Sequence, residues 1–411
     1  MSGCRAGMAV WVVAALCVTA CVEPQGQAAT RTLVVEAGDQ ARTWVPMSIE
    51  TPKNTTTAKM SANGTEVPCQ VAEGKLWWIL DRLDAGATKS YTVELGTAPS
   101  APPSAVSLKQ ADETVDIAIG GKPFTTYNFT LKKSCGQQLR RPCFFPVYGP
   151  DQVLMVRPYP LTDTLPIDCR KDHPHHTSIW VAYGKVNGTD NWSIHKTAGW
   201  QVHKGFETVA SGAVMGMFRE SLDWTSVDKK PVMAETRTAR VYAQPDTHRM
   251  LDLEVRFIAK YGQVEFGDTK EGGLCATRMR PEFRHDKKYG KDGKLVNDQG
   301  QLGGAAWGKK AAWVDASGTV DGKRLGFAIF DAPTNLRHPT TWHARTYRLL
   351  TANPFGLSYF TRKKERGEYT LDAGKELVFR YRIYFHVGDE KAGQVAARYG
   401  DYATPPKAAW R

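Results

Sequence analysis

Alternation of apolar and polar positions dominates this chain. The clearest example runs from Leu377 to His386, where arginines alternate with Phe379, Tyr381 and Ile383. Such a period of two places every second side chain on one face, as a half-buried β-strand requires. Further segments with this pattern are residues 115–119, 241–243, 250–258, 312–315 and 325–330. The pattern therefore predicts an all-β domain, a large antiparallel two-sheet sandwich, with a barrel as the alternative.

Shorter alternating segments occupy residues 30–97 and predict a small β-sandwich module. Turn-forming pairs such as Asn63-Gly64 separate them. Residues 98–105, rich in Pro, Ser and Ala, are typical of a linker. The large β-sandwich domain is then predicted for residues 106–411, which is long enough for one core. Within it we expect a helix only across residues 390–399.

Residues 1–29 have the features of a targeting segment. Met8 to Ala20 is apolar but short for a membrane span. Val18-Thr19-Ala20-Cys21 resembles a bacterial lipobox, which predicts a lipid on Cys21; ordinary cleavage near residues 26–28 is the alternative. Both imply export to the periplasm or the cell envelope. The membrane would then be contacted only through the lipid, since no later segment reaches the length of a transmembrane helix.

Charge and cysteine content narrow the partners. The chain has 54 basic and 42 acidic residues, a formal net charge of +12. In an exported protein this argues against nucleic acid and favours a carbohydrate, an acidic sugar or the envelope surface; a generally basic, solvated surface is the alternative. Cys135 and Cys143 flank a short segment and could form a disulfide in an oxidising periplasm.

Three of the ten histidines fall within four residues, at His173, His175 and His176, directly after Asp172. Histidine suits both proton transfer and metal ligation near neutral pH. Because Pro174 favours extended backbone, alternation would separate His176 from the other two unless the strand begins after it. We expect His175 and His176 to act in acid/base catalysis. The cofactor is left open: a divalent metal could be held by Asp172, His173 and His175, although no zincin or zinc-finger spacing is present.

Two further stretches carry candidate chemistry. A polar loop at residues 331–345 is typical of a sugar site, because tryptophan stacks on a pyranose while Asn and Arg bind hydroxyls or carboxylates. A packed loop with a core tryptophan is the alternative. At residues 269–274, a lysine beside a glutamate could serve acid/base work or form an exposed turn. The candidates are His343 and Glu271 as catalytic residues and Lys270, Asn335, Arg337, Trp342, Asn187 and Asp190 as substrate-binding residues.

We expect the histidine stretch and the polar loop to share one pocket. In that arrangement His175 or His176 faces His343 and Arg337 across a cleft, and the Lys270–Glu271 pair lies on its rim.

Several motifs together resemble one bacterial family. They are Tyr148-Gly149-Pro150, the Asp172–His176 stretch with Trp180, residues 186–192, residues 268–272, and residues 335–343 followed by residues 351–356. In this order they are similar to the family filed under the label "methane oxygenase PmoA". The resemblance covers nearly all of the region after the linker, and it implies a place in the exported sugar-catabolic repertoire of glycan-degrading bacteria. It supplies no catalytic residues.

Three functions are compatible with these features. The first is an exported carbohydrate-active enzyme, a lyase or hydrolase, that uses histidine acid/base chemistry for elimination, isomerisation or hydrolysis of a sugar. The second is a non-catalytic glycan-binding envelope lipoprotein. The third is a metal-dependent oxygenase, as the family label implies, with two histidines and a carboxylate at an open metal site.

Overall fold

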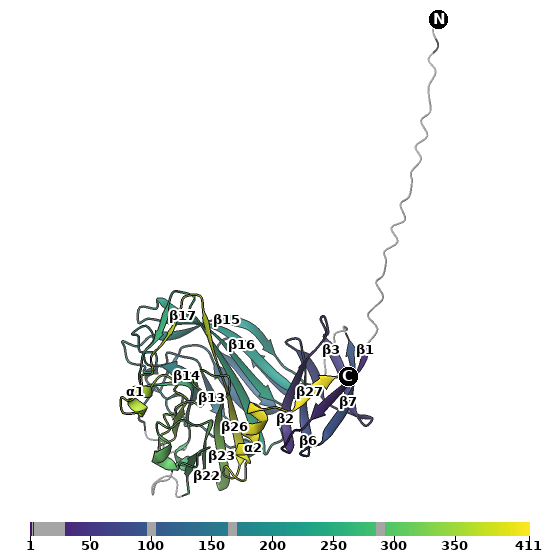
Figure 1. Ribbon diagram of the computed structural model, residues 1–411. Coiled ribbons are helices and arrows are strands. Elements are labelled where there is room, and N and C mark those ends of the chain that lie inside the picture. Colours follow the sequence, from purple (N-terminus) through teal and green to yellow (C-terminus); the bar gives the residue numbers. More distant parts are fainter. Residues whose placement is uncertain (2, 4–28, 97–103, 163–170, 285–291) are drawn as a thin grey trace.

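The computed structural model describes residues 1, 3, 29–96, 104–162, 171–284 and 292–411. Most of the predicted leader, including Cys21, and residues 97–103 of the linker region lie outside these ranges. Within them no helix is long and apolar enough to cross a membrane. The fold is all-β, as predicted, and consists of antiparallel sheets in a larger and a smaller unit (Figure 1).

Two sheets face each other in the larger unit. The eight-stranded sheet comprises, in spatial order, β15 (Trp200–Ala210), β16 (Met215–Thr225), β17 (Pro231–Tyr242), β18 (His248–Ile258), β26 (Glu376–Val387), β23 (Lys323–Asp331), β22 (Trp313–Val320) and β21 (Lys294–Asn297). The seven-stranded sheet comprises β24 (Leu349–Thr351), β20 (Gly272–Arg278), β14 (Ile179–Tyr183), β13 (Cys143–Val147), β10 (Lys122–Asn128), β9 (Thr114–Ile119) and β8 (Val106–Gln110). Tyr127 of one sheet stacks on Phe218 of the other with ring centroids 4.5 Å apart. The predicted two-sheet sandwich is confirmed.

Strand β26 shows why alternation was informative. Phe379, Tyr381 and Ile383 are buried in the core that both sheets share, whereas Arg380 between them is exposed. Burying three large apolar side chains on one face contributes about 1.5–3 kcal/mol each. The strand pairs in register with β18 on one side and β23 on the other.

Short elements connect these strands. They are the ribbons β11 (Lys133–Ser134) with β12 (Gln137–Gln138) and β19 (Val264–Phe266) with β25 (Tyr369–Leu371), the helix α1 (Leu357–Phe360), and the 3-10 turns at Pro150–Gln152, Pro281–Phe283 and Gly303–Ala306. The predicted helix at 390–399 is present but shifted, as α2 (Val395–Ala403). It begins late because the Asp389 carboxylate accepts the backbone N–H groups of Lys391 and Ala392 and holds that segment in a turn.

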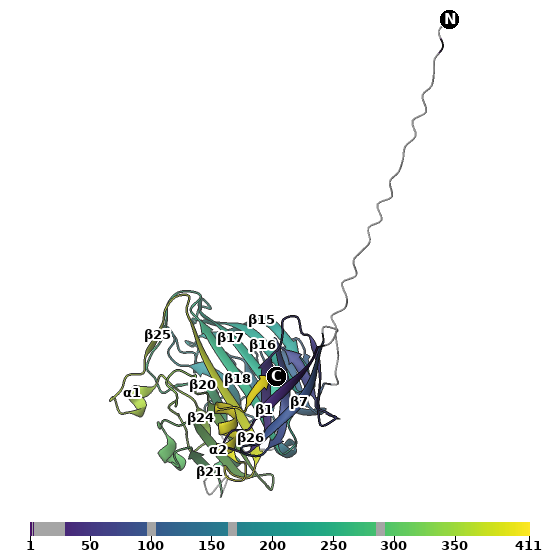
Figure 2. The ribbon, with the colours of Figure 1, turned by 45° about the vertical axis from the view of Figure 1, so that its right-hand side comes forward.

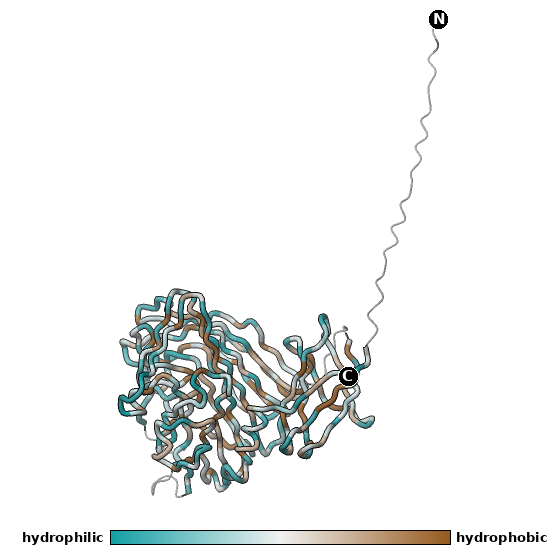
Figure 3. The backbone as a smooth tube through the Cα atoms, in the orientation of Figure 1, coloured by the Kyte–Doolittle hydropathy of each residue, from teal (hydrophilic) through white to brown (hydrophobic). Residues whose placement is uncertain are grey.

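The smaller unit has its own core, which includes Leu33, Trp78 and Val93. Its two sheets comprise β27 (Lys407–Trp410), β1 (Ala29–Glu36), β7 (Thr88–Gly96), β3 (Thr57–Ala62) and β4 (Thr65–Glu66), and β2 (Arg42–Glu50), β6 (Lys75–Leu83) and β5 (Cys69–Ala72). Strand β27 comes from the far end of the sequence and pairs with β1. Figure 3 shows hydrophobic stretches along strands of both units.

Polar contacts join the two units, which lie side by side in Figures 1 and 2. Glu73 of the smaller unit forms ion pairs with Arg219 and Arg240 of the larger unit. Arg42 of β2 bonds to the buried Asp401 of α2 at 3.1 Å. The units are therefore fastened at several points.

Cys135 and Cys143, which could have formed a disulfide, are both free thiols in this structure. Cys143 is buried in β13, opposite Trp180 of β14. Cys135 lies in the turn between β11 and β12 with a positive φ of 45°.

Candidate functional site

The histidine stretch forms an irregular loop that leads into β14. His173 and Ser178 both have left-handed backbone, with φ of 44° and 70°, and the strand begins only at Ile179. The His176 N–H donates to the His173 carbonyl at 3.0 Å, which turns the chain back on itself. Alternation therefore does not apply, and all three imidazoles can gather on one side of the loop.

Arg157 holds the first part of the loop. Its guanidinium is buried and donates to the Asp172 carboxylate at 2.7 Å, to the Asp172 carbonyl at 2.9 Å and to the His173 carbonyl at 3.0 Å. Loop carbonyls that bond to a buried, permanently charged group are held firmly. The left-handed backbone at His173 is stabilised in this way.

Arg141 does the same for the second part. It is buried, and donates to the carbonyls of His175 at 2.9 Å, Trp192 at 2.5 Å and Ser193 at 2.7 Å. Trp192 is placed against the histidines by this bond, with its ring 5.9 Å from that of His175. Two arginines from outside the loop therefore fix the positions of the imidazoles.

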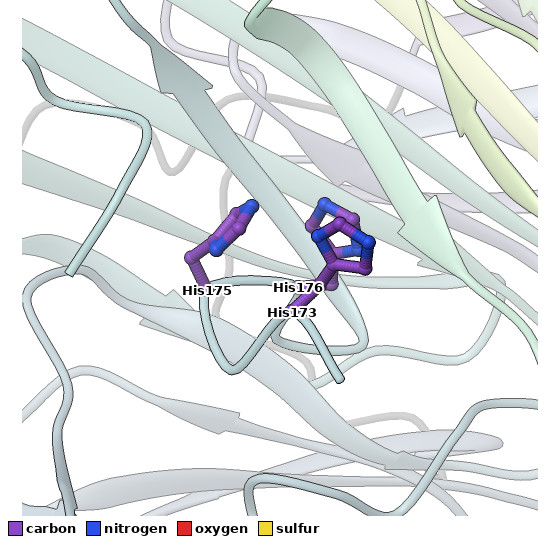
Figure 4. A group of neighbouring side chains, drawn as sticks. All are labelled: His173, His175 and His176. Carbon is purple, nitrogen blue, oxygen red and sulfur yellow. The ribbon is translucent and has the colours of Figure 1, made fainter. Parts of the chain in front are cut away.

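The three histidines form a compact cluster. One ring nitrogen of each of His173, His175 and His176 lies within 4.8 Å of the others. The rings of His173 and His176 stack at 4.8 Å and 10°, while His175 stands almost perpendicular to His176 at 4.3 Å and 76°. Figure 4 shows His175 to one side of the His173 and His176 rings, which overlap in this view.

Two further planar side chains pack beside the stacked pair, and Tyr347 lies close to both of its histidines, 6.4 Å from His176. Tyr347 stacks on His173 at 5.7 Å and 9°, and Trp180 stacks on His176 at 5.6 Å and 21°. The Arg278 guanidinium lies 4.3 Å from the Tyr347 ring centroid. Because these contacts use the ring faces, the nitrogen-bearing ring edges of the two histidines stay available for a ligand.

Burial keeps the cluster neutral. It lowers the pKa of His175 to about 3, with Arg141 and His173 adding to the effect. It also lowers the pKa of His176 well below 6.5, and that of His173 in the same direction. Moreover, His176 Nδ1 is buried and has no hydrogen-bond partner among the described residues. At neutral pH the imidazoles offer lone pairs rather than positive charge.

Asp172 is placed differently from what the candidate metal set required. Its Oδ1 atom accepts hydrogen bonds from Arg157 at 2.7 Å and Arg278 at 3.1 Å. Burial, together with the charge of Arg157, lowers the pKa of Arg278 to about 9. The cluster of candidate ligand atoms accordingly comprises His173, His175 and His176, and does not include Asp172.

The polar loop at 331–345 is packed, which is the alternative that the sequence left open, and three of its candidate sugar-binding residues have partners within the protein. Trp342 is fully buried and donates to the Ala311 carbonyl at 2.8 Å, so its ring cannot stack on a sugar. Asn335 is buried and bonds to the carboxylate of Asp331 and the backbone of Arg380. The Arg337 guanidinium donates to the carbonyls of Pro354, Gly367 and Glu368.

His343 lies outside the cluster. Its ring contacts are with Trp307 and Phe360, and its Nδ1 accepts a hydrogen bond from Trp307 Nε1 at 3.4 Å. Burial, with Arg345 and Lys270 nearby, lowers its pKa to about 3. None of these contacts joins His343 to the histidine loop, so they give no support to the shared cleft that we expected.

The remaining candidates lie in turns. Lys270 and Glu271 form an ion pair just before β20, the strand that ends with Arg278. The negative charge of Glu271 acts to raise the pKa of His173, against the effect of burial. Asn187 bonds to the backbone of Gln263 and Glu265, and Asp190 accepts the N–H groups of Trp192 and Ser193. Both residues shape turns, and Asp190 also places Trp192.

Sequence reasoning missed the residues that surround the cluster. Arg141 and Arg157 lie on either side of β13, Arg278 ends β20, and Tyr347 precedes β24. Strands β13, β14, β20 and β24 are neighbours in one sheet, which brings these positions together. No local pattern marks the arginines. The aromatic Tyr347 between Arg345 and Arg348 was the only visible signal.

Comparisons with known proteins identify a family for this chain. A model described as "Family of unknown function (DUF6807)" matches residues 114–400. No curated protein matches. A solved structure of the alpha-galactosidase from Lactobacillus brevis is 10% identical over 74% of this chain and 42% of that chain, with a TM-score of 0.29. At that level the likeness assigns no activity, and the resemblance to the "methane oxygenase PmoA" family stays a prediction.

Proposed function

The chain belongs to this family of unknown function, DUF6807, and we propose that it is a metal-dependent enzyme acting on a carbohydrate, with His173, His175 and His176 as the metal ligands. The observation that carries the proposal is the convergence of three ring nitrogens within 4.8 Å of one another. Three histidines with an open position are the ligand set of several catalytic zinc sites. The same set also suits copper, iron and nickel.

A metal site accounts for the cluster better than the metal-free acid/base role expected from the sequence. A general base works best when its pKa is near the working pH, whereas the pKa of His175 is about 3. Neutral imidazoles are, by contrast, the form that binds metal. The buried His176 Nδ1, which has no partner among the described residues, is the kind of atom that a ligand would satisfy.

The residues around the cluster have defined tasks in this proposal. His173, His175 and His176 would hold the ion, since one ring nitrogen of each lies within 4.8 Å of the others. Arg157 and Arg141 would keep the loop in place through their hydrogen bonds to the carbonyls of His173 and His175. A bound ion would supply a Lewis acid and lower the pKa of a bound water. The carbohydrate substrate is supported by the resemblance to an exported sugar-catabolic family.

Metal analysis of the purified protein tests the proposal. After dialysis against trace zinc, copper, iron or nickel, we expect about one equivalent per chain by mass spectrometry. His173→Ala and His175→Ala should each lower the affinity by at least about 100-fold, the upper end of what outer partners of metal ligands cause. His173 is exposed, so its variant should keep the fold. His195→Ala is the matched control, since His195 is exposed and contacts Thr197.

Turnover is then measured on native and oxidised disaccharides with the metal-loaded and the chelated protein. Turnover that survives chelation would favour the metal-free acid/base role. Sugar binding without turnover would favour a glycan-binding lipoprotein. Oxygen consumption on a sugar would identify an oxygenase. Equal metal content in the wild type and the His173 variant would contradict the proposal.

Export of the chain, with a lipid on Cys21, belongs to the same proposal. Its basis is the apolar stretch from Met8 to Ala20 and the lipobox-like Val18–Cys21. Cells that produce the protein should incorporate radiolabelled palmitate into it and retain it in the membrane fraction. Label that persists in Cys21→Ala would show that the anchor is elsewhere, and unlabelled periplasmic protein would point to ordinary cleavage.

A further inference from the structure

Beside the histidine cluster, Arg278 has an incomplete set of partners. Its side chain is buried, with 3% exposed. Nη2 donates to Asp172 Oδ1 at 3.1 Å, an atom that also accepts from Arg157 at 2.7 Å. Nη1 is buried and has no hydrogen-bond partner among the described residues. Within the described residues, the positive charge of this guanidinium is therefore balanced by a hydrogen bond to one carboxylate oxygen, which it shares with Arg157.

Such an arrangement has a physical cost. A guanidinium is always charged and has five donors in a rigid fork, and burying it is favourable only when acceptors satisfy the fork. A second carboxylate, which accepts two parallel hydrogen bonds, is the group that fits best. The chain supplies no such carboxylate to Nη1 within the described residues. The missing acceptor is an external ligand in this interpretation.

The surroundings of Arg278 favour a ligand with both an anionic group and a polar ring. Tyr347 contacts both Arg278 and His173, with the guanidinium 4.3 Å from its ring centroid and the His173 ring 5.7 Å away. The exposed Arg345 lies over the same ring at 5.4 Å and adds a second positive charge. Tyr347 is half-buried and carries a hydroxyl that can donate a hydrogen bond.

We propose that Arg278, with Arg345 and Tyr347, forms a subsite for the carboxylate of an acidic sugar whose reacting atoms reach the histidine cluster. The inference rests on the proposed function for its carbohydrate class, but not on the metal. It makes Arg278 the residue that separates a uronic acid from the corresponding neutral sugar. The same donors would also accept a free sulfate or phosphate ion, so the experiment has to distinguish the two sources.

Calorimetric titration provides that distinction. The probes are D-galacturonate and D-glucuronate, the neutral sugars D-galactose and D-glucose, and inorganic sulfate and phosphate. For the wild type we expect each uronate to bind at least about tenfold more tightly than its neutral counterpart. Arg278→Gln should abolish that preference. Arg278→Lys should keep part of it, because the charge remains while the bidentate geometry is lost.

Matched variants keep the test decisive. Arg345→Gln removes an exposed charge, leaves the fold intact and should weaken uronate binding about two- to fivefold, since exposed charges contribute less. Arg256→Gln, on β18 in the eight-stranded sheet, is the control that should change nothing. If Arg278→Gln does not fold, the wild-type preference and the Arg345 variant decide.

Two results would overturn the proposal. One is equal affinity of the wild type for uronates and neutral sugars. The other is sulfate or phosphate binding as tightly as the uronates with the same dependence on Arg278, which would indicate a site for a free anion. Metal content is measured in parallel. A protein that binds no metal but prefers uronates would contradict the proposed function and support this subsite. A protein that binds metal but has no preference for uronates would contradict this subsite alone.

Discussion

At the scale of single residues, the histidines of this fold occupy contrasting environments. His343 is buried and His175 half-buried, neither has a carboxylate as hydrogen-bond partner within the described residues, and burial lowers the pKa of each to about 3. His386 is also buried, but it bonds to the Asp315 carboxylate at 2.8 Å. His195 is exposed and bonds to Thr197 at 2.9 Å. A histidine whose pKa is lowered by burial links stability to pH.

His343 should make the protein less stable in acid. Its folded pKa of about 3 lies below the 6.5 of a free histidine, so below pH 6.5 the unfolded chain binds a proton that the folded chain refuses. The stabilisation is therefore complete above pH 6.5 and is lost as the pH falls towards 3. Each such group contributes a slope of about 1.4 kcal/mol per pH unit in that window.

Urea unfolding at pH 7, 6, 5 and 4 measures that slope. His343→Gln keeps an acceptor for Trp307 Nε1 but cannot titrate, so its slope should be smaller by about one proton. His195→Gln, at an exposed histidine, is the matched control. An unchanged slope in the His343 variant would mean that the ring is accessible to protons in the folded state.

At the scale of elements, strands were easier to predict than the loops between them. The alternation from Leu377 to His386 depends only on local spacing, and β26 has the predicted span within two residues. The Asp172–His176 cluster was found because its members are sequence neighbours. Loop composition, however, is the same for a surface platform and a packed loop. Trp342 is therefore in the core although its neighbours are polar.

The partners of the cluster could not be predicted for a related reason. Arg157, Arg278 and Tyr347 reach the loop only because β13, β14, β20 and β24 are adjacent in the sheet. Strand order is set by contacts between distant parts of the chain, which leave no local periodicity. From the sequence, the residues of the histidine loop were therefore predictable, but their charged surroundings were not.

Strand β27 provides a test at this scale. It covers one edge of β1, and Trp410 Nε1 donates to the Glu50 carbonyl at 2.8 Å. Deleting residues 407–411 should expose that edge and increase aggregation, since uncovered strand edges pair with other chains. Amide exchange of Leu33 to Glu36 should become faster, while exchange in β26 stays the same.

Trp410→Ala is the matched control for the deletion. It removes the indole contact but keeps the backbone pairing with β1, so its effect on exchange should be smaller. Equal protection of β1 in the wild type and the deletion would show that β27 adds nothing to the smaller sheet.

At the scale of the whole molecule, the two units are connected by more than the chain that runs between them. Glu73 bonds to Arg219 and Arg240, Gln70 Nε2 donates to the Met215 carbonyl at 2.9 Å, and Arg42 reaches Asp401. These residues lie far apart in sequence. The alternating pattern that predicted two units therefore could not predict this joint, the set of contacts between them. The larger unit carries the histidine cluster, and the joint fixes its position relative to the smaller one.

The return of β27 to β1 also has a mechanical consequence. The chain leaves the smaller unit after β7 and comes back to it at β27, so the larger unit is attached at two offset points. A unit attached by a single connection can rotate about it, whereas a second connection at another point prevents that rotation. A force pulling along β1 would be resisted by the backbone hydrogen bonds to both of its neighbours, β7 and β27, which would be loaded in shear. The histidine loop would then keep its orientation relative to the smaller unit when force acts on the protein.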